Sequence, residues 1–182
     1  MAHLRDCVRQ QLDAFERHLQ RLPDFIDVHQ HVHQLPAVRQ VLLAELAQRQ
    51  GQPTLRRTRG AHWRGAKAAL IGGLGGRALE QLAAAQGVAM QNTDFAGVYA
   101  FDDRQPYARH VARWLASLDA GGLLMTHPAR PGAASAHDAI REARWREHAF
   151  WLSGEPAALR CGWQGASAAV RGQSPQRPEP EG

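Results

Sequence analysis

The fold and the candidate site both depend on one stretch, FIDVHQHVHQLP, at residues 25–36. Across residues 24–33, apolar and polar side chains alternate. One face would carry Ile26, Val28 and Val32, and the other Asp27, His29, His31 and His33. Alternation with β-branched residues predicts a β-strand. We therefore expect an apolar face packed against helices, and a polar face lining a site near the carboxyl end of the strand, where β/α folds place catalytic groups.

The polar face of this strand offers side chains that suit a metal ion. Neutral imidazoles are good ligands for zinc and similar divalent ions, and a neighbouring carboxylate such as Asp27 can orient one of them. Two other interpretations stay open, namely a histidine-rich exposed edge and an accidental run of histidines. The flanking aspartate and the strand context favour the metal site.

Helices and strands alternate outward from this stretch. Apolar residues three and four positions apart predict helices over residues 2–22, from Pro36 to just before Gly51, and over 76–86, 106–118 and 138–152. Short strands are expected within residues 95–101 and 123–126, and the glycine-rich residues 72–76 are expected to form a flexible turn. This alternation predicts the α/β class.

Two residues outside the histidine stretch could carry chemistry. His127 follows the expected strand at 123–126 and precedes Pro128, which is where a β/α barrel presents catalytic groups, so its imidazole could act as a general acid or base. Arg56 could hold a carboxylate by a charge-assisted hydrogen bond. A structural role stays open for each: a core histidine bonded to a backbone carbonyl, and a solvated surface arginine.

Length and composition limit the fold and exclude several classes of protein. The 182 residues fit one domain, expected over residues 1–170, with a disordered proline-rich tail at 171–182. The net charge is +5, but Lys67 is the single lysine and the arginines are scattered, so we expect no nucleic-acid partner. No run reaches the ~18 apolar residues of a membrane span. The N-terminus does not read as a secretory signal, and Cys7 and Cys161 are far apart in the sequence. We therefore expect a cytoplasmic protein.

Together these segments resemble the YdjC-like carbohydrate deacetylases, a family that includes chitooligosaccharide deacetylases and deacetylases associated with hopanoid biosynthesis. The stretch DVHQHVHQLP at 27–36 is similar to the family signature D-x-H-x-H-V-H-x-x-P. GGLLMTHP at 121–128 looks like its G-x-L-M-x-H-P segment. Ala143, Arg144 and Glu147 resemble the A-R-x-x-E motif of the family's closing helix. The resemblance covers about residues 4–155.

The resemblance implies a deformed (β/α) barrel of the polysaccharide-deacetylase-like type. It also implies a bound divalent metal ion, Mg²⁺ or Zn²⁺, and removal of the acetyl group from an N-acetylated sugar or glycolipid. By the same resemblance, His29 is a metal ligand, His127 is the acid that protonates the leaving amine, and Arg56 lies near the catalytic carboxylate. The residues expected around the metal ligand are Asp27, His31 and His33.

The sequence departs from the family pattern in one respect. The family's first strand ends in Asp-Asp-Phe-Gly and a later segment carries Gly-x-His. By the resemblance these two segments supply the other two metal ligands, and neither occurs ahead of Asp27 in this sequence. We therefore expect a partial barrel whose N-terminal strands are missing, with an open sheet edge that would favour a homodimer. Two interpretations of function follow: a metal-dependent deacetylase whose full-length form is active, or a truncated, non-catalytic remnant or binding module of that family.

Overall fold

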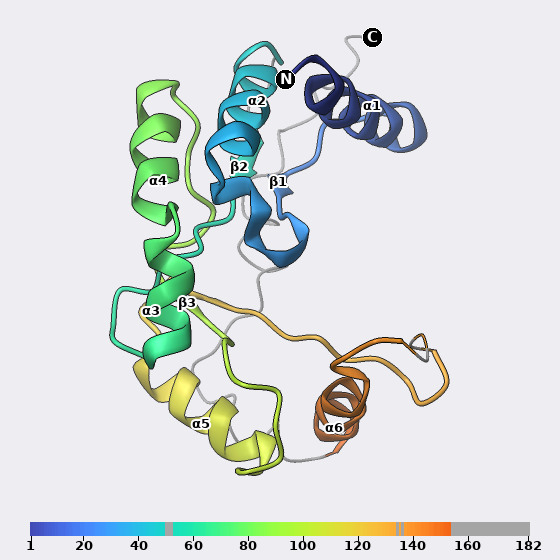
Figure 1. Ribbon diagram of the computed structural model, residues 1–182, viewed down its shortest axis with the longest axis vertical. Helices are drawn as coiled ribbons and strands as arrows, with labels where there is room; N and C mark the ends of the chain where they lie inside the picture. Colours follow the sequence, from blue (N-terminus) through green and yellow to red (C-terminus); the bar gives the residue numbers. More distant parts are fainter. Residues whose placement is uncertain (50–52, 134, 136, 154–182) are drawn as a thin grey trace, which may run out of the picture.

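The computed structural model describes residues 1–49, 53–133, 135 and 137–153. Its elements are α1 (Ala2–Leu19), β1 (Phe25–Ile26), the 3₁₀-helix η1 (His29–Gln34), α2 (Pro36–Ala47), β2 (Thr54–Leu55), α3 (Ala66–Gly73), α4 (Gly76–Ala85), β3 (Phe95–Ala96), α5 (Tyr107–Ser117), β4 (Leu123–Leu124) and α6 (Arg141–Leu152). Figure 1 shows them along an arc, from α1 and α2 through α4 and α3 to α5 and α6. Helices and parallel strands alternate, so the chain is an α/β protein. The expected tail at 171–182 lies outside the described residues.

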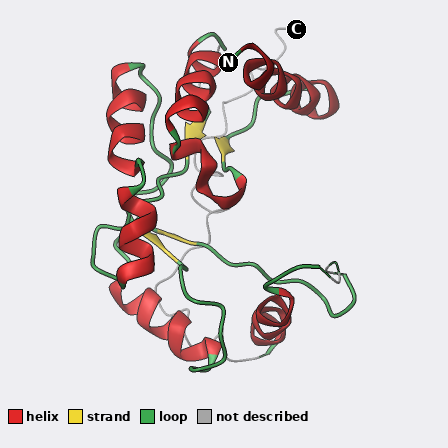
Figure 2. Ribbon diagram, viewed as in Figure 1, coloured by secondary structure: helices red, strands yellow, loops and turns green. Residues whose placement is uncertain are grey.

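The strands are short and form two parallel pairs, β1 with β2 and β3 with β4, drawn as the yellow segments of Figure 2. The segment before β3 also runs beside β2, because the Leu55 N–H donates to Ala89 O and Leu55 O accepts from the Gln91 N–H. Neighbouring strands therefore follow chain order, as in successive β–α units: β1, β2, residues 89–96, β4. The residues that the structure describes do not close into a barrel.

Two apolar clusters hold the helices against the strands. The first joins α1, α2 and α4 to β2, and its buried members are Leu12, Leu42, Leu43, Leu46, Leu55, Leu79, Ala83 and Val88. The second joins α5 and α6 to the end of β3, and its buried members are Ala96, Tyr99, Tyr107, Val111, Trp114 and Phe150. Burying each large apolar side chain stabilises the fold by about 1.5–3 kcal/mol. The two clusters therefore hold in place the loops that follow the strands.

The strand expected over residues 24–33 is wrong beyond Ile26. β1 ends there, and the last hydrogen bond of its ladder runs from the Arg56 N–H to Ile26 O. The chain then turns through η1, which is closed by local backbone hydrogen bonds three residues apart. A 3₁₀-turn does not alternate its side chains between two faces. The polar side chains of this stretch therefore do not line one strand face: His29 is exposed, whereas Asp27, His31 and His33 contact Arg56.

The expected helices are confirmed as α1, α2, α4, α5 and α6, with ends that differ by up to three residues from the expected bounds at α1 and α6. The short strands expected within 95–101 and 123–126 are confirmed as β3 and β4. Helix α3 was not expected, and it takes up the first glycines of the supposed flexible turn. Gly75, between α3 and α4, has a φ of 128°, and a Cβ there would lie 2.4 Å from Gln34 O. That turn therefore requires glycine.

Candidate functional site

Arg56 is the centre of the candidate site. It follows β2 directly, and its side chain is 2% exposed. Its Nε donates to Asp27 Oδ1 at 2.5 Å, and its guanidinium lies over the Phe95 ring, 4.9 Å from the centroid. Burial lowers the pKa of Arg56, and the Asp27 carboxylate opposes that shift. Arg56 is thus no solvated surface arginine, and the carboxylate that it holds in this structure is Asp27.

The same guanidinium fixes where His31 carries its proton. Arg56 Nη2 lies 3.0 Å from His31 Nδ1. Because a guanidinium only donates, Nδ1 accepts, and the neutral ring carries its proton on Nε2. Burial, followed by the charge of Arg56, lowers the pKa of His31 to about 4. At neutral pH His31 therefore offers an Nε2–H donor, and neither of its nitrogens is free to bind a metal.

His33 is a buried histidine bonded to the backbone. It is 0% exposed, and its Nε2 lies 3.0 Å from Arg56 O. A carbonyl oxygen only accepts, so Nε2 donates. Burial lowers the pKa of His33 to about 4. His33 thus fixes the backbone of Arg56 while Asp27 and His31 fix its side chain.

His29 lies apart from this network. It is exposed on η1, and within the described parts of the chain its side chain makes no recorded hydrogen bond or ion pair. A catalytic zinc ion usually takes three protein ligands. His31 Nδ1 accepts from Arg56 and His33 Nε2 donates to Arg56 O. Among the described residues this leaves His33 Nδ1 buried without a hydrogen bond, and His29 as the exposed imidazole of the stretch. The described residues therefore do not assemble the expected metal site.

His127 follows β4 and is held by α6. Its backbone N–H donates to Glu147 Oε2 at 2.5 Å, and its Nδ1 lies 3.8 Å from Glu147 Oε1. The Arg144 side chain donates to His127 O at 3.3 Å, and the Phe101 ring packs edge-to-face against the imidazole at 5.2 Å. The His127 side chain keeps 23% exposure. The backbone of His127 is therefore held by α6, and its imidazole is buried at Nδ1 and partly open to solvent.

Sequence reasoning did not assign roles to Glu147 and Tyr99. Glu147 is 0% exposed and accepts a hydrogen bond from the Tyr99 hydroxyl at 2.7 Å. Burial, followed by the Glu147 carboxylate, raises the pKa of Tyr99. The available signal was the A-R-x-x-E spacing, which puts Arg144 and Glu147 about one turn apart on α6. The structure shows that both side chains of this motif contact His127.

The Arg56 network and His127 lie near one another. Arg56 comes directly after β2 and His127 comes three residues after β4, and parallel strands bring their carboxyl ends to the same edge. The charge of His127 also contributes to the lowered pKa of His31, after the larger effects of burial and of Arg56. The two imidazoles are therefore within electrostatic reach of each other.

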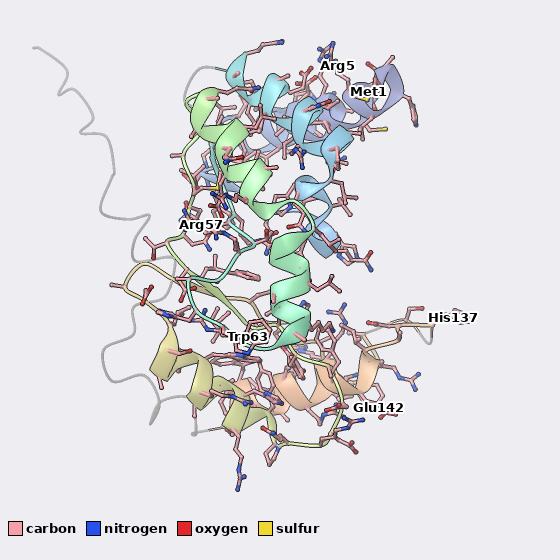
Figure 3. All side chains as sticks on the ribbon, turned by 60° about the vertical axis from the view of Figure 1, so that its left-hand side comes forward. Met1, Arg5, Arg57, Trp63, His137 and Glu142 are labelled. Carbon is pink, nitrogen blue, oxygen red and sulfur yellow. The ribbon has the colours of Figure 1, made fainter. Side chains whose placement is uncertain are left out.

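A cavity of about 640 Å³ adjoins the Arg56 network. Phe95 lines this cavity, and its ring also contacts His31 edge-to-face at 5.8 Å. Other lining residues include Arg59, Arg77 and Trp63. Trp63, which Figure 3 labels near the start of α3, is 76% exposed. The cavity thus combines an exposed aromatic face with polar side chains, beside the candidate site.

A second group of side chains has metal-ligand chemistry. His62, Asp94 and Asp119 bring a nitrogen and two carboxylates within 4.8 Å of one another. The Asp94 carboxylate is already occupied, because Arg64 donates to its two oxygens at 2.8 and 2.5 Å and the Ala61 N–H donates at 2.6 Å. Burial raises the pKa of Asp94, but these hydrogen bonds outweigh burial and lower it to about 2. We interpret the group as an internal ion-pair network.

Comparison with known families matches the chain over most of its length. The model of one family, described as "YdjC-like protein", matches residues 1–160, which include every residue of the candidate site. Neither a curated protein nor a solved structure matches the chain. In the described residues, no helix is both long enough and apolar enough to cross a membrane.

Proposed function

Because the chain belongs to the YdjC-like family, which is related to carbohydrate deacetylases, we propose that it hydrolyses the N-acetyl amide of an acetylated sugar or glycolipid. The placement of His127 carries the proposal. Its backbone is held by α6, its imidazole is partly open to solvent, and the ring lies within electrostatic reach of His31. A positioned imidazole of this kind suits general acid–base catalysis.

The chemistry assigns a separate task to each group. Water adds to the amide carbonyl carbon, the C–N bond breaks, and acetate and a free amine leave. Nε2 of His127 takes a proton from the attacking water, and the ring then delivers a proton to the leaving nitrogen. The Nε2–H of His31, whose position Arg56 fixes, donates a hydrogen bond to the oxygen that gains negative charge. Asp27 and His33 hold Arg56 in place for this purpose.

The divalent ion implied by the family resemblance, Mg²⁺ or Zn²⁺, does not fit the described residues as a complete site. His29 offers one exposed imidazole, whereas a catalytic zinc ion usually takes three protein ligands. No step above therefore passes through an ion.

We keep His29 as the proposed ligand from this stretch. Calorimetric titration with Zn²⁺ tests it, since His29→Ala should weaken binding at least ~10-fold and His18→Ala, on α1, should not.

The cavity beside Phe95 gives the sugar a place to bind. An exposed indole such as Trp63 offers a flat apolar face together with an N–H, which suits the faces and hydroxyls of a sugar ring.

We also propose that the β–α units belong to a partial, deformed (β/α) barrel within a single domain over residues 1–170. The chain-order succession of parallel strands supports this architecture.

Release of acetate from N-acetylated amino sugars tests the proposal. We expect the chain to release acetate, measured by proton NMR with and without added Zn²⁺ or Mg²⁺. His127→Asn should lower kcat by about 10²–10⁴-fold, because the leaving amine loses its proton donor. The matched control is His137→Asn, an exposed histidine for which we propose no role, and it should keep the wild-type rate. Absence of acetate release under all these conditions would contradict the proposal.

A second candidate function is a non-catalytic binding module or remnant of the same family. The histidine stretch favours it, because His29 is its one exposed imidazole and the described residues do not complete a metal site. This alternative predicts that the chain binds N-acetylated sugars in equilibrium dialysis but releases no acetate. It also predicts that His127→Asn leaves sugar binding unchanged.

A further inference from the structure

We propose that Glu147 is a positioning residue for His127: its buried carboxylate keeps Nδ1 of the imidazole turned into the protein, so that Nε2 faces the substrate. This inference rests on the proposed function, in which His127 is the proton donor. It goes further by naming the group that determines which ring nitrogen faces the substrate and exchanges the proton. It also gives a function to the A-R-x-x-E spacing of α6.

Burial makes the Glu147 carboxylate an unusual group. It is 0% exposed and lies beside the aromatic cluster of α5 and α6. A carboxylate in such surroundings is costly unless hydrogen bonds satisfy it. Its two oxygens are satisfied by the Tyr99 hydroxyl at 2.7 Å and the His127 N–H at 2.5 Å. Both partners come from loops that follow β3 and β4, so Glu147 ties these loops to α6.

The backbone of His127 is held at two points from one helix. Glu147 accepts its N–H, and Arg144, one turn earlier on α6, donates to its C=O. The Phe101 ring covers one face or edge of the imidazole, and Phe101 itself has a left-handed φ of 64°. A non-glycine residue in that conformation is strained, which is a feature found where structure serves a site. The backbone of His127 is therefore held at two points, and one ring packs against its imidazole.

The second Glu147 oxygen faces the imidazole itself. Oε1 lies 3.8 Å from His127 Nδ1, which is buried and makes no hydrogen bond with the residues that the structure describes. That separation is longer than a hydrogen bond, and catalytic contacts of this kind are often long before substrate binds. A negative charge beside Nδ1 favours the proton on Nδ1, as carboxylates next to other catalytic and metal-binding histidines do. A residue at position 147 that only accepted the His127 backbone N–H would not need a negative charge.

The proton position on His127 can be read directly from nitrogen-15 chemical shifts of the full chain. We expect neutral wild-type His127 to carry its proton mainly on Nδ1, and Glu147→Gln to shift it toward Nε2. The matched control is Glu142→Gln, which removes the same charge from the exposed side of α6 and should change nothing. The spectrum of His127→Asn identifies the signal. Identical His127 signals in wild type and a folded Glu147→Gln would overturn the proposal.

A second variant keeps the test valid if Glu147→Gln fails to fold. Tyr99→Phe removes one hydrogen bond from the carboxylate but keeps its charge beside Nδ1. We expect its His127 to keep the wild-type proton position even though the fold is destabilised. A shift toward Nε2 in Tyr99→Phe as well would show that packing alone sets the proton position, and would overturn the proposal.

The kinetic measurement separates this inference from the proposed function. If the wild type releases acetate, Glu147→Gln should lower kcat by about 10–100-fold with KM within about twofold, as for other outer partners of catalytic histidines. An unchanged kcat would overturn the role of Glu147. If the wild type releases no acetate, the proposed function fails, while the nitrogen-15 experiment still decides whether Glu147 sets the proton position of His127.

Discussion

Arg56 shows how one side chain can organise a site. Its guanidinium contacts Asp27, His31 and the Phe95 ring, and its carbonyl oxygen binds His33. Sequence reasoning selected the charged and histidine members of this group one by one. It could not predict that they converge on an arginine, because the contacts join positions more than twenty residues apart. Glu147 belongs to the A-R-x-x-E spacing, but that spacing does not reveal its contact with His127, and packing brings Phe95 and Tyr99 to the site.

Arg56→Lys tests this organisation without removing the positive charge. A lysine has one ammonium group and cannot reach Asp27 and His31 together, so one of these two partners loses its hydrogen bond inside the Arg56 network. We expect the free energy of unfolding to fall by about 2 kcal/mol in urea titrations. Arg57→Lys, at the neighbouring and more exposed position, should change it by about 0.5 kcal/mol or less. Equal effects of the two substitutions would show that Arg56 has no special place.

The buried histidines predict a pH dependence of stability. The folded pKa values of His31 and His33 are both lowered to about 4, from an ordinary value near 6.5. Between these values the unfolded chain binds more protons than the folded chain. Stability therefore rises with pH from about 4 to 6.5, by up to about 1.4 kcal/mol per pH unit for each histidine, and is complete above that range.

Urea unfolding at pH 5, 6 and 7 measures this dependence. His33→Asn keeps a donor for Arg56 O but does not titrate, so it should roughly halve the slope. A stability that stays constant between pH 5 and pH 7 in the wild type would mean that the two rings are not held neutral by burial.

Among the elements, η1 marks where sequence patterns stop being informative. Alternating residues predicted a strand, yet β1 ends at Ile26 because its pairing with β2 ends there. A period of two in the sequence cannot reveal whether a partner strand continues alongside. The amphipathic helices were predictable, since three- and four-residue spacing reports directly on a buried helix face. Helix α3 was missed because its alanines and glycines carry little of that pattern.

The turn in η1 makes a prediction about backbone strain. Gln30 is exposed and has a φ of 52° and a ψ of 26°, in the left-handed region. A β-branched residue tolerates this region poorly, whereas glycine enters it freely. Gln30→Val should lower the free energy of unfolding by about 1–2 kcal/mol, and Gln30→Gly should leave it unchanged or raise it. Thermal unfolding that ranks valine equal to glycine would contradict the left-handed turn.

The arrangement of all the elements places the candidate site between two apolar clusters. One cluster holds β2 and Arg56, and the other holds the loops that carry Tyr99 and His127. Figure 1 shows these groups at the two ends of the arc, with β3 between them. The α/β class could be predicted from the sequence, because it depends on the order of helices and strands. The juxtaposition of the two groups could not, because it depends on how residues 89–96 pair with strands on both sides.

The cavity beside Phe95 connects this arrangement to substrate binding. If the sugar ring stacks on Trp63, then Trp63→Ala should raise KM about 10-fold or more and leave kcat within about threefold, because a contact made equally in ground and transition states affects binding alone. Trp63→Phe should recover most of the affinity. Initial rates of acetate release over a range of sugar concentrations provide both constants. An unchanged KM in Trp63→Ala would show that the sugar does not bind in this cavity.

The proposal as a whole requires that Arg56 and His127 act on one substrate in one site. A double-mutant cycle on kcat/KM for acetate release, with Arg56→Lys, His127→Asn and the double variant, measures this most directly. Residues that act as a unit have non-additive effects, so the double variant should be no more than about threefold slower than the slower single variant. If the two losses instead multiply, or if Arg56→Lys leaves the rate unchanged, the Arg56 network and His127 do not form one catalytic site.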